Sequence, residues 1–182
     1  MAELDNPQTI EERRAALIIK YRNLQVESVE KEESRLIYIL LRGDERYIMH
    51  IHLNKATIGI AYIRELRDQI QEQGMDGGII VADGKYTYSA RSNSVDMAIE
   101  LIPSSIPAFD VFQHKLVPLH EIMSDEEKDG LAKEYHAEPY KFPWIKSDDP
   151  IAIIIGAKAG DVVRITQKSQ TAGKYFSYRY VV

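Results

Sequence analysis

The sequence contains no cysteine, which rules out disulfide bonds and thiolate metal ligands in this chain. It also lacks an excess of positive charge, because its net charge is −5 at pH 7. Residues 113–182 carry 10 basic and 10 acidic residues, so the negative charge lies in residues 1–112. Autonomous nucleic-acid-binding proteins obtain most of their affinity by neutralising phosphates. A role near DNA would therefore require neighbouring proteins to supply positive charge.

Long hydrophobic runs are missing as well. The longest apolar run is Leu36–Leu41, far short of the roughly 20 residues that cross a membrane. The first residues are acidic and polar, whereas a secretion signal would be basic and then apolar. We therefore expect a soluble, intracellular protein. Its 182 residues are enough for one large domain or two small ones.

Residues 1–112 show the pattern of an α/β domain. A capping box at Thr9 and Glu12 predicts a helix over residues 8–24. The charged segment 27–35 is typical of a solvated linker or helix end. Two strands are expected at residues 36–41 and 47–53, the first apolar on both faces and therefore central in its sheet.

The second half of this region continues the alternation. Apolar spacing predicts a helix over residues 59–73, ended by Gly74 as a left-handed cap. A buried strand at 78–82, a helix over 89–101 and a short strand at 108–112 follow. In the helix, Val95, Ile99 and Ile102 are expected to face inward. The order of strands and helices in residues 1–112 predicts a mixed sheet covered by helices.

Residues 113–182 indicate a small α+β domain. Ser124 and Glu127 form a capping box for a helix that runs to about residue 136, and a loop with Pro139, Pro143 and Trp144 follows. Asp149 suits the N-cap of a short helix with Pro150 at its first position and Gly156 at its end. A hairpin closes the chain, with strands around a turn at Ala172–Gly173.

The closing strand has two faces and an aromatic character. Phe176, Tyr178, Tyr180 and Val182 share one face by alternation, and the residues between them share the other. The tyrosines could stack on bases. A packed sheet face or a subunit interface is the favoured interpretation, because no basic groove accompanies them. A strand of this kind is well placed to add to another sheet, in this chain or in a partner.

Few residues indicate catalysis or metal binding. His50 and His52 lie two apart on a strand and could bind a metal together, but a site needs a third and a fourth ligand. The favoured alternative is two solvent-facing histidines on a half-exposed sheet. The glycines provide no phosphate-binding loop, and no nucleophile, histidine and acid arrangement is evident. We predict no catalytic residue, no metal and no cofactor.

Six sequence blocks in residues 113–182 resemble the small common subunit of archaeal and eukaryotic DNA-directed RNA polymerases, which is the fifth of the subunits shared by all the nuclear enzymes. The first block is His-x-Leu-Val-Pro-x-His and the last is Ser-x-Thr-Ala-Gly-x-Tyr-x-x-Tyr-Arg, with the blocks in the family's order. The resemblance implies a largest-subunit interface at these residues: His114, Leu116, Val117, Pro118, His120, Asp149, Pro150, Thr171, Gly173, Tyr175, Tyr178 and Arg179.

The resemblance implies a domain organisation and a role. Residues 113–182 would be the assembly domain, which docks on the largest subunit. Residues 1–112 match less well, yet residues 59–81 and 89–97 resemble the second half of the eukaryotic jaw domain beside downstream DNA. That jaw has a fold related to restriction endonucleases. The protein would be a non-catalytic polymerase subunit without cofactor, small-molecule substrate or membrane partner, located in the nucleus.

Two alternatives remain, one from departures from the family pattern and one from the fold that the jaw resemblance implies. Trp144 and the pair Gln167–Lys168 stand where the family usually has arginine-containing pairs. This divergence makes a viral member, located in a viral factory or virion, one alternative. The other is a degenerate restriction-like nuclease or a DNA-binding protein outside polymerase. Such a nuclease holds a divalent metal with an Asp and a Glu-x-Lys, and the relevant strand has His50-Ile51-His52 instead. We therefore expect no nuclease activity.

Overall fold

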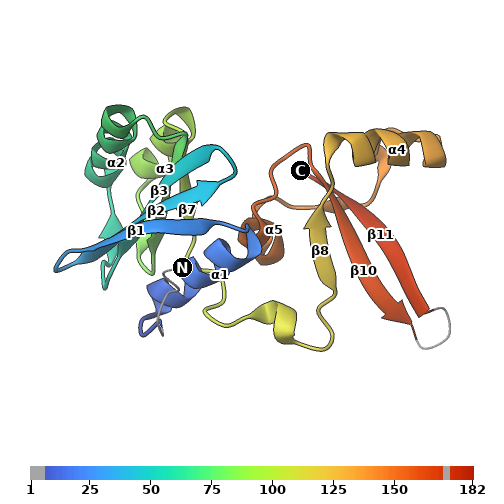
Figure 1. Ribbon diagram of the computed structural model, residues 1–182, viewed down its shortest axis with the longest axis horizontal. Helices are drawn as coiled ribbons and strands as arrows, with labels where there is room; N and C mark the ends of the chain where they lie inside the picture. Colours follow the sequence, from blue (N-terminus) through green and yellow to red (C-terminus); the bar gives the residue numbers. More distant parts are fainter. Residues whose placement is uncertain (1–6, 170–172) are drawn as a thin grey trace. The chain divides into compact units, whose positions relative to one another are not determined.

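The computed structural model describes residues 7–169 and 173–182. The chain forms two compact units, Met1–Phe109 and Asp110–Val182. We call them the N-terminal unit and the C-terminal unit and describe each by itself. Each contains its own sheet and its own helices (Figure 1).

The N-terminal unit is built on a five-stranded sheet of order β1-β2-β3-β5-β7. Its strands are β1 (Gln25–Lys31), β2 (Arg35–Arg42), β3 (Glu45–His52), β5 (Gly77–Ala82) and β7 (Ile99–Ile102). β1, β2 and β3 pair antiparallel, whereas β3, β5 and β7 pair parallel. The predicted mixed α/β architecture is therefore confirmed, and β2 is an interior strand as its apolar faces indicated. β4 (Thr57–Ile58) and β6 (Lys85–Tyr86) form a separate two-stranded pair.

Helices cover both faces of this sheet (Figure 1). α1 (Ile10–Tyr21) lies against one face, and α2 (Ile60–Gln73) and α3 (Tyr88–Asp96) lie against the other. The predicted capping box of α1 is present, with the Glu12 backbone N–H donating to Thr9 Oγ1 at 3.2 Å. α2 buries Ile63, Leu66 and Ile70 on the sheet, as its apolar spacing predicted. Within the described residues, every helix is too short or too polar to cross a bilayer.

The charged segment 27–35 was wrongly interpreted as a linker or helix end. Residues 25–31 form β1, an edge strand that pairs antiparallel with β2. Its side chains are almost all exposed. An edge strand tolerates charges because one side of its ladder and most of its side chains face water. Composition alone could not separate this exposed strand from a loop.

Two further predictions before the C-terminal unit were wrong. The expected helix over residues 89–101 ends at Asp96, and β7 begins at Ile99 after Ala98 takes a positive φ of 54°. Val95 is 79% exposed instead of facing inward, whereas Ile99 and Ile102 are buried on the strand. The expected strand at 108–112 is absent from these described residues. The Asp110 carboxylate instead accepts from Phe112 N and caps a short 3-10 helix, η1 (Val111–Gln113).

The two strand histidines are buried, not solvent-facing. His50 is 0% exposed and His52 is 1% exposed, on the face of β3 that α2 covers. His50 Nε2 lies 2.8 Å from Gln69 Oε1, and the ring of His52 packs against Tyr62 with 4.7 Å between centroids. The alternation of β3 was correct, but nothing in the spacing of its residues indicated that α2 covers this face.

The C-terminal unit contains a four-stranded sheet of order β8-β10-β11-β9. Its elements after η1 are β8 (Leu119–Ile122), α4 (Asp125–Tyr135), the 3-10 helix η2 (Pro139–Lys141), β9 (Trp144–Ile145), α5 (Pro150–Ile155), β10 (Val162–Ser169) and β11 (Gly173–Val181). The long β10–β11 hairpin is antiparallel, β8 pairs antiparallel with β10, and β9 pairs parallel with the end of β11. The expected turn at Ala172–Gly173 lies partly outside the described residues.

Local signals predicted most helix ends of this unit. The Ser124–Glu127 capping box begins α4, and the Asp149 carboxylate accepts from Ile151 N at 2.8 Å to begin α5. Gly156 ends α5 with φ 81°. The loop expected around Pro143 contains more structure than predicted, because η2 and β9 form there. α4 packs Leu131 on Met123 and Val162 to make a small core beneath one face of the sheet.

Candidate functional site

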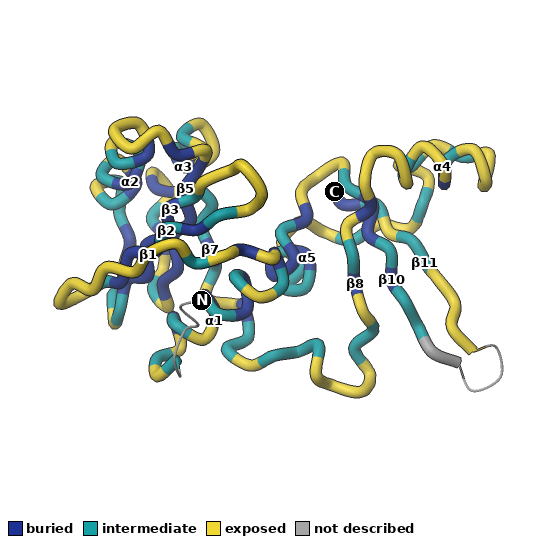
Figure 2. The backbone as a smooth tube through the Cα atoms, viewed as in Figure 1, coloured by how far each residue is buried: buried dark blue, intermediate teal, exposed yellow. Residues whose placement is uncertain are grey.

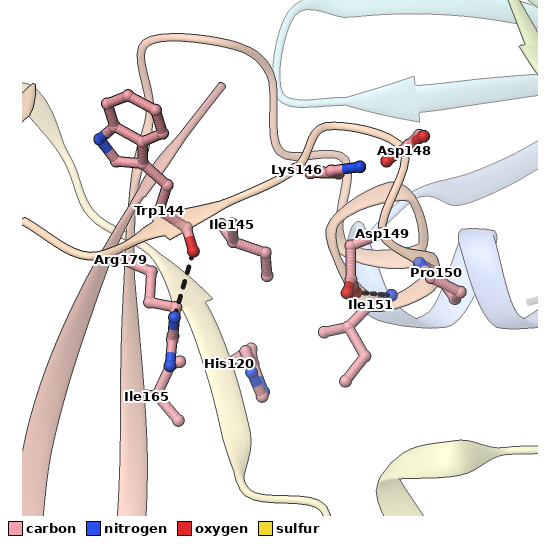
Figure 3. Close-up of a pocket in the computed structure, with 10 residues that line it drawn as sticks. All are labelled: His120, Trp144, Ile145, Lys146, Asp148, Asp149, Pro150, Ile151, Ile165 and Arg179. Atoms are coloured by element: carbon pink, nitrogen blue, oxygen red, sulfur yellow. Dashed lines mark hydrogen bonds between the residues drawn. The ribbon is translucent and has the colours of Figure 1, made fainter.

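An open depression of about 550 Å³ lies in the C-terminal unit. Strands β8, β9, β10 and β11 and the start of α5 supply its walls (Figure 3). It is lined by His120, Trp144, Ile145, Lys146, Asp148, Asp149, Pro150, Ile151, Ile165 and Arg179. These residues are far apart in the sequence, so the depression depends on the tertiary fold of the unit.

The sheet places His120 and Ile165 side by side. They are direct partners in the β8–β10 register, so their side chains point to the same face. The His120 Nδ1 atom lies 2.8 Å from the Pro118 carbonyl oxygen, which fixes the orientation of the ring. His120 is 9% exposed, and burial lowers the pKa of its imidazole from the usual value of 6.5. At neutral pH the ring is therefore an uncharged polar group.

Arg179 joins β11 to β9. Its Nη1 atom donates to the Trp144 carbonyl oxygen at 3.1 Å (Figure 3). This bond uses one of the five N–H donors of the guanidinium, and Arg179 is exposed. The Trp144 indole turns away from the other lining side chains in Figure 3 and is 64% exposed. Its Nε1 donates to the Tyr140 carbonyl oxygen at 3.0 Å.

The start of α5 provides the opposite wall. Asp149 caps the helix through Ile151 N, and Pro150 occupies the first turn, where its missing N–H is no loss. Lys146 and Asp148 belong to the preceding loop and also line the depression. Charges of both signs therefore stand around apolar side chains of Ile145, Ile151 and Ile165. An apolar floor with a mixed-charge rim fits the docking of a polypeptide surface.

The structure brings four of the residues predicted from the sequence into this depression: His120, Asp149, Pro150 and Arg179. His114, Leu116, Val117 and Pro118 instead form the turn that enters β8, where Leu116 is 81% exposed. Gly173 begins β11 with φ 70°. Thr171 lies outside the described residues. The predicted set therefore divides into four residues of the depression, four residues of the turn before β8, and the remaining described residues, which lie along β11.

Tyr175 and Tyr178 lie on opposite faces of β11. Tyr175 is 44% exposed, and its hydroxyl contacts the Gln167 side-chain oxygen on β10. Tyr178 is half-buried, and its ring packs edge to face against Tyr135 and in a tilted geometry against Phe142. Burial raises the pKa of the Tyr178 hydroxyl above its usual value. Tyr178 is thus part of a packed sheet face, which was the favoured interpretation over base stacking.

The sequence interpretation missed six of the lining residues as site residues: Trp144, Ile145, Lys146, Asp148, Ile151 and Ile165. The sequence interpretation placed Trp144 in a loop and singled it out as a departure from the family pattern, without assigning it to a site. The residue type itself was a usable signal, since Trp is enriched in protein interfaces. Ile165 has the pattern of an ordinary core residue and could be placed in the depression only through the β8–β10 register.

The N-terminal unit has a second, polar depression of about 450 Å³ beside the β4–β6 pair. Glu11, Lys55, Asp83 and Lys85 are among the residues that line it. Across residues 7–169 and 173–182, no group of three or more His, Asp or Glu side chains has the geometry of a metal site. The histidine pair His50 and His52 is therefore not joined by a third ligand among the described residues.

Comparison with known proteins relates the chain to RNA polymerase subunits. Residues 109–181 match the family described as RNA polymerase Rpb5, C-terminal domain. The chain is 50% identical over 74 residues to DNA-directed RNA polymerase subunit Rpo5 of Thermococcus onnurineus. The aligned stretch covers 41% of this chain and 90% of that protein. Rpo5 of Sulfurisphaera tokodaii is 47% identical over 79 residues, with 43% of this chain and 94% of the relative covered.

A eukaryotic relative is similar over a longer stretch. The chain is 37% identical over 131 residues to the Caenorhabditis elegans protein named DNA-directed RNA polymerases I, II, and III subunit RPABC1. That stretch covers 70% of this chain and 62% of the nematode protein. The similarity therefore extends beyond the C-terminal unit, while the chain spans less than two thirds of this relative.

Proposed function

Because the chain belongs to the family of RNA polymerase subunits that includes archaeal Rpo5 and eukaryotic RPABC1, we propose that it is a non-catalytic subunit of a multisubunit DNA-directed RNA polymerase. The C-terminal unit is its assembly domain and docks on the largest subunit. The N-terminal unit is a jaw domain close to downstream DNA. The protein acts in the nucleus if its polymerase is cellular, or in a viral factory or virion if it is viral.

One observation supports the docking surface above the others. Four residues that were selected from sequence blocks, His120, Asp149, Pro150 and Arg179, line a single depression of the unit that matches the family. The exposed Trp144 stands beside them. Exposed Trp and Arg side chains around an apolar floor are typical of the residues that dominate binding energy in interfaces.

The charge distribution supports the role proposed for the N-terminal unit. All of the net charge of −5 falls in residues 1–112. Such a unit would not hold DNA by itself, because binding requires neutralisation of phosphates. A position near DNA therefore depends on other polymerase subunits. The restriction-like character of this unit is part of the proposal.

Affinity purification tests the proposed function. The tagged chain is isolated gently from its native cells, and co-purifying proteins are identified by mass spectrometry. We expect the two large polymerase subunits in amounts near that of the tagged chain. Recovery of the chain alone from an extract in which the polymerase remains intact would contradict the proposal.

Arg179→Ala tests the docking surface within the same experiment. We expect polymerase recovery to fall by roughly 10-fold, because an interface arginine that fills a desolvated pocket can contribute more than 1 kcal/mol. Lys133→Ala is the matched control, because it also removes an exposed positive charge from the C-terminal unit but lies in α4, away from the depression. Equal losses of polymerase recovery for the two variants would show that the depression is not the docking surface.

The alternative function, a restriction-like nuclease, is tested separately by incubating the purified chain with DNA and Mg²⁺ or Mn²⁺. At the strand position where a Glu-x-Lys would be needed, His50 and His52 are enclosed by α2. We expect no cleavage above that of a buffer control. Metal-dependent cleavage that co-elutes with the chain would favour the alternative.

A further inference from the structure

We propose that the open edge of β11 receives an extended segment of another polymerase subunit as an added β-strand, and that this segment carries acidic and apolar side chains. The inference rests on the proposed function, because it specifies how the C-terminal unit engages its partner. The binding element is the backbone of residues 174–178, which is distinct from the depression that contains Arg179.

β11 leaves most of one edge without a strand partner. β10 pairs with it along residues Gly173–Tyr180, whereas β9 pairs with the other edge only at Tyr180 and Val181. In the part of the chain that the structure describes, no other strand joins β11. Figure 2 shows this strand exposed over most of its length. The backbone of residues 174–178 therefore presents an unfilled ladder.

The hydrogen bonds at the end of β11 show which groups point outward. Tyr180 N donates to the Pro143 carbonyl oxygen at 2.9 Å, and Val182 N donates to the Ile145 carbonyl oxygen at 3.0 Å, both on the β9 side. Because N–H groups alternate along an antiparallel strand, the amides of Lys174, Phe176 and Tyr178 also point to this side. The amides of Tyr175, Ser177 and Arg179 point toward β10.

Of the features that prevent strand addition, this edge has only two charged residues, Lys174 and Arg179. Native proteins block edges with charges, bulges, prolines or short strands. β1, at the edge of the other sheet, has Glu27, Glu30 and Lys31 and a bulge between Val26 and Ser28. β8, at the far edge of the C-terminal sheet, has only four residues. β11 has nine residues, its register with β10 is regular, and its sequence GKYFSYRYV contains no proline and no acid.

The side chains of β11 indicate the chemistry of the segment. Lys174 and Arg179 are its two charged residues, and both are positive. Tyr175 and Phe176 lie on opposite faces and are 44% and 54% exposed. An incoming strand would place alternate side chains on each face beside these rings. Within residues 174–178, an acidic residue would complement Lys174, and apolar residues would cover the rings of Tyr175 and Phe176.

The pairing of β9 shows that this edge accepts a strand. β9 occupies the same edge at Tyr180 and Val181, and its chain enters from Pro143. A partner strand at residues 174–178 would continue the ladder from this point toward the hairpin end. Both edges of β11 would then be paired. Main-chain hydrogen bonds of this kind provide the affinity when a peptide adds a strand to a sheet edge.

Amide hydrogen exchange on the wild-type chain tests the inference directly. In the free chain, the amides of Lys174, Phe176 and Tyr178 should exchange much faster than those of Tyr175, Ser177 and Arg179, which are bonded to β10. In the assembled polymerase, the outward amides should be slowed at least roughly 10-fold, since a ladder hydrogen bond then protects them. Unchanged exchange in a polymerase that contains the chain would overturn the inference while leaving the proposed function in place.

Two pairs of variants separate backbone from side-chain effects. Phe176→Pro removes the ring and an outward N–H, whereas Phe176→Ala removes the ring alone. Polymerase recovery should be roughly 10-fold lower for the proline variant, because an unpaired carbonyl is left on the partner strand. Edge positions tolerate proline, and circular dichroism and thermal melting check that both variants fold. Because the proposed segment is acidic, Lys174→Glu should reduce recovery more than Lys174→Met, and equal recovery of these two variants would contradict an acidic segment.

Other outcomes have definite meanings. If wild-type chain recovers no polymerase, the proposed function fails and the inference falls with it. If the purified chain dimerises by size exclusion and its outward amides are protected in that dimer, a second copy is the occupant and the inference is overturned. Equal recovery for Phe176→Pro and Phe176→Ala also contradicts strand addition.

Discussion

The imidazole rings of His50 and His52 lie edge to face, with centroids 5.9 Å apart, in the buried interior of the N-terminal unit. Burial, together with the nearby Arg35 guanidinium, lowers the pKa of each ring from 6.5 to about 4. The hydrogen bond to Gln69 and the charges of Glu65 and Glu32 oppose this shift at His50, and Glu65 opposes it at His52. Two uncharged histidines are therefore part of the native core.

The pair predicts that stability falls with decreasing pH. Between the native pKa and 6.5, the unfolded chain binds more protons than the native chain, so unfolding becomes easier as pH falls. Full stability is expected above pH 6.5, and the loss on going to about pH 5 should be about 2–4 kcal/mol for both rings together, given about 1.4 kcal/mol per unit of pKa shift. Urea denaturation across this range measures the effect.

His52→Leu should weaken this pH dependence. The His52 Nε2 atom is buried without a hydrogen-bond partner among the described residues, so an apolar replacement should be nearly neutral at pH 7. The exposed His114, replaced by Gln, is the control and should leave the dependence unchanged. A His52→Leu chain with the wild-type pH profile would contradict the assignment of the effect to the buried ring.

Local chemistry explains what the sequence could predict of the fold. Each correctly predicted helix start depends on neighbouring residues. These are the capping boxes at Thr9–Glu12 and Ser124–Glu127 and the Asp149–Pro150 start of α5. β7 was missed because Val95, Ile99 and Ile102 have helical spacing, while the strand is fixed by pairing with β5. Pairing between distant segments cannot be read from spacing within one segment.

The same distinction applies to the candidate site. His120, Asp149 and Arg179 were selected because they resemble a family pattern, and the fold places them around one depression. That Tyr178 and Arg179 point to opposite faces followed from alternation alone. Which face α4 would cover did not follow, because α4 buries only Leu131 and its sequence is polar over most of its length.

Arg14 is predicted to be important for the stability of the N-terminal unit. Its buried guanidinium donates to the carbonyl oxygens of Ile106 and Ser104, each at 2.7 Å, and contacts Asp83 at 2.6 Å. Arg14→Ala should lower the free energy of unfolding by about 2–4 kcal/mol, because it leaves buried acceptors unpaired. Chemical denaturation provides the measurement.

The control for Arg14 is Arg67→Ala. Arg67 pairs with its neighbour Asp68 on the exposed side of α2, and an exposed pair of this kind contributes less than about 1 kcal/mol. If Arg14→Ala were as mild as Arg67→Ala, the loop after β7 would not depend on the buried guanidinium.

Gly84 lies where a side chain cannot fit. A Cβ atom built there would stand 2.0 Å from the Lys55 carbonyl oxygen and 2.7 Å from that of Ala56. These are backbone atoms and cannot rotate away, so Gly84→Ala should cost about 2–3 kcal/mol through displacement of the β4–β6 pair. Thermal unfolding measures the cost. Gly59→Ala meets nothing within 4 Å, so its effect should stay below about 1 kcal/mol.

Tyr178 and Arg179 are adjacent in the sequence but should fail in different assays. The Tyr178 ring lies 5.9 Å from Tyr135 and 6.1 Å from Phe142 and packs on the core of the C-terminal unit. Tyr178→Ala should therefore lower the free energy of unfolding by about 2–3 kcal/mol, whereas Tyr178→Phe keeps the ring and most of the stability.

Arg179→Ala should leave unfolding within about 1 kcal/mol of wild type, since the side chain is exposed and its loss removes a single hydrogen bond to the Trp144 carbonyl oxygen. It should reduce polymerase recovery instead. Denaturation and affinity purification of the same three proteins separate the two effects. A Tyr178→Ala chain that unfolds like wild type yet fails to recover polymerase would move Tyr178 from the packed face to the docking surface, where the sequence pattern had placed it.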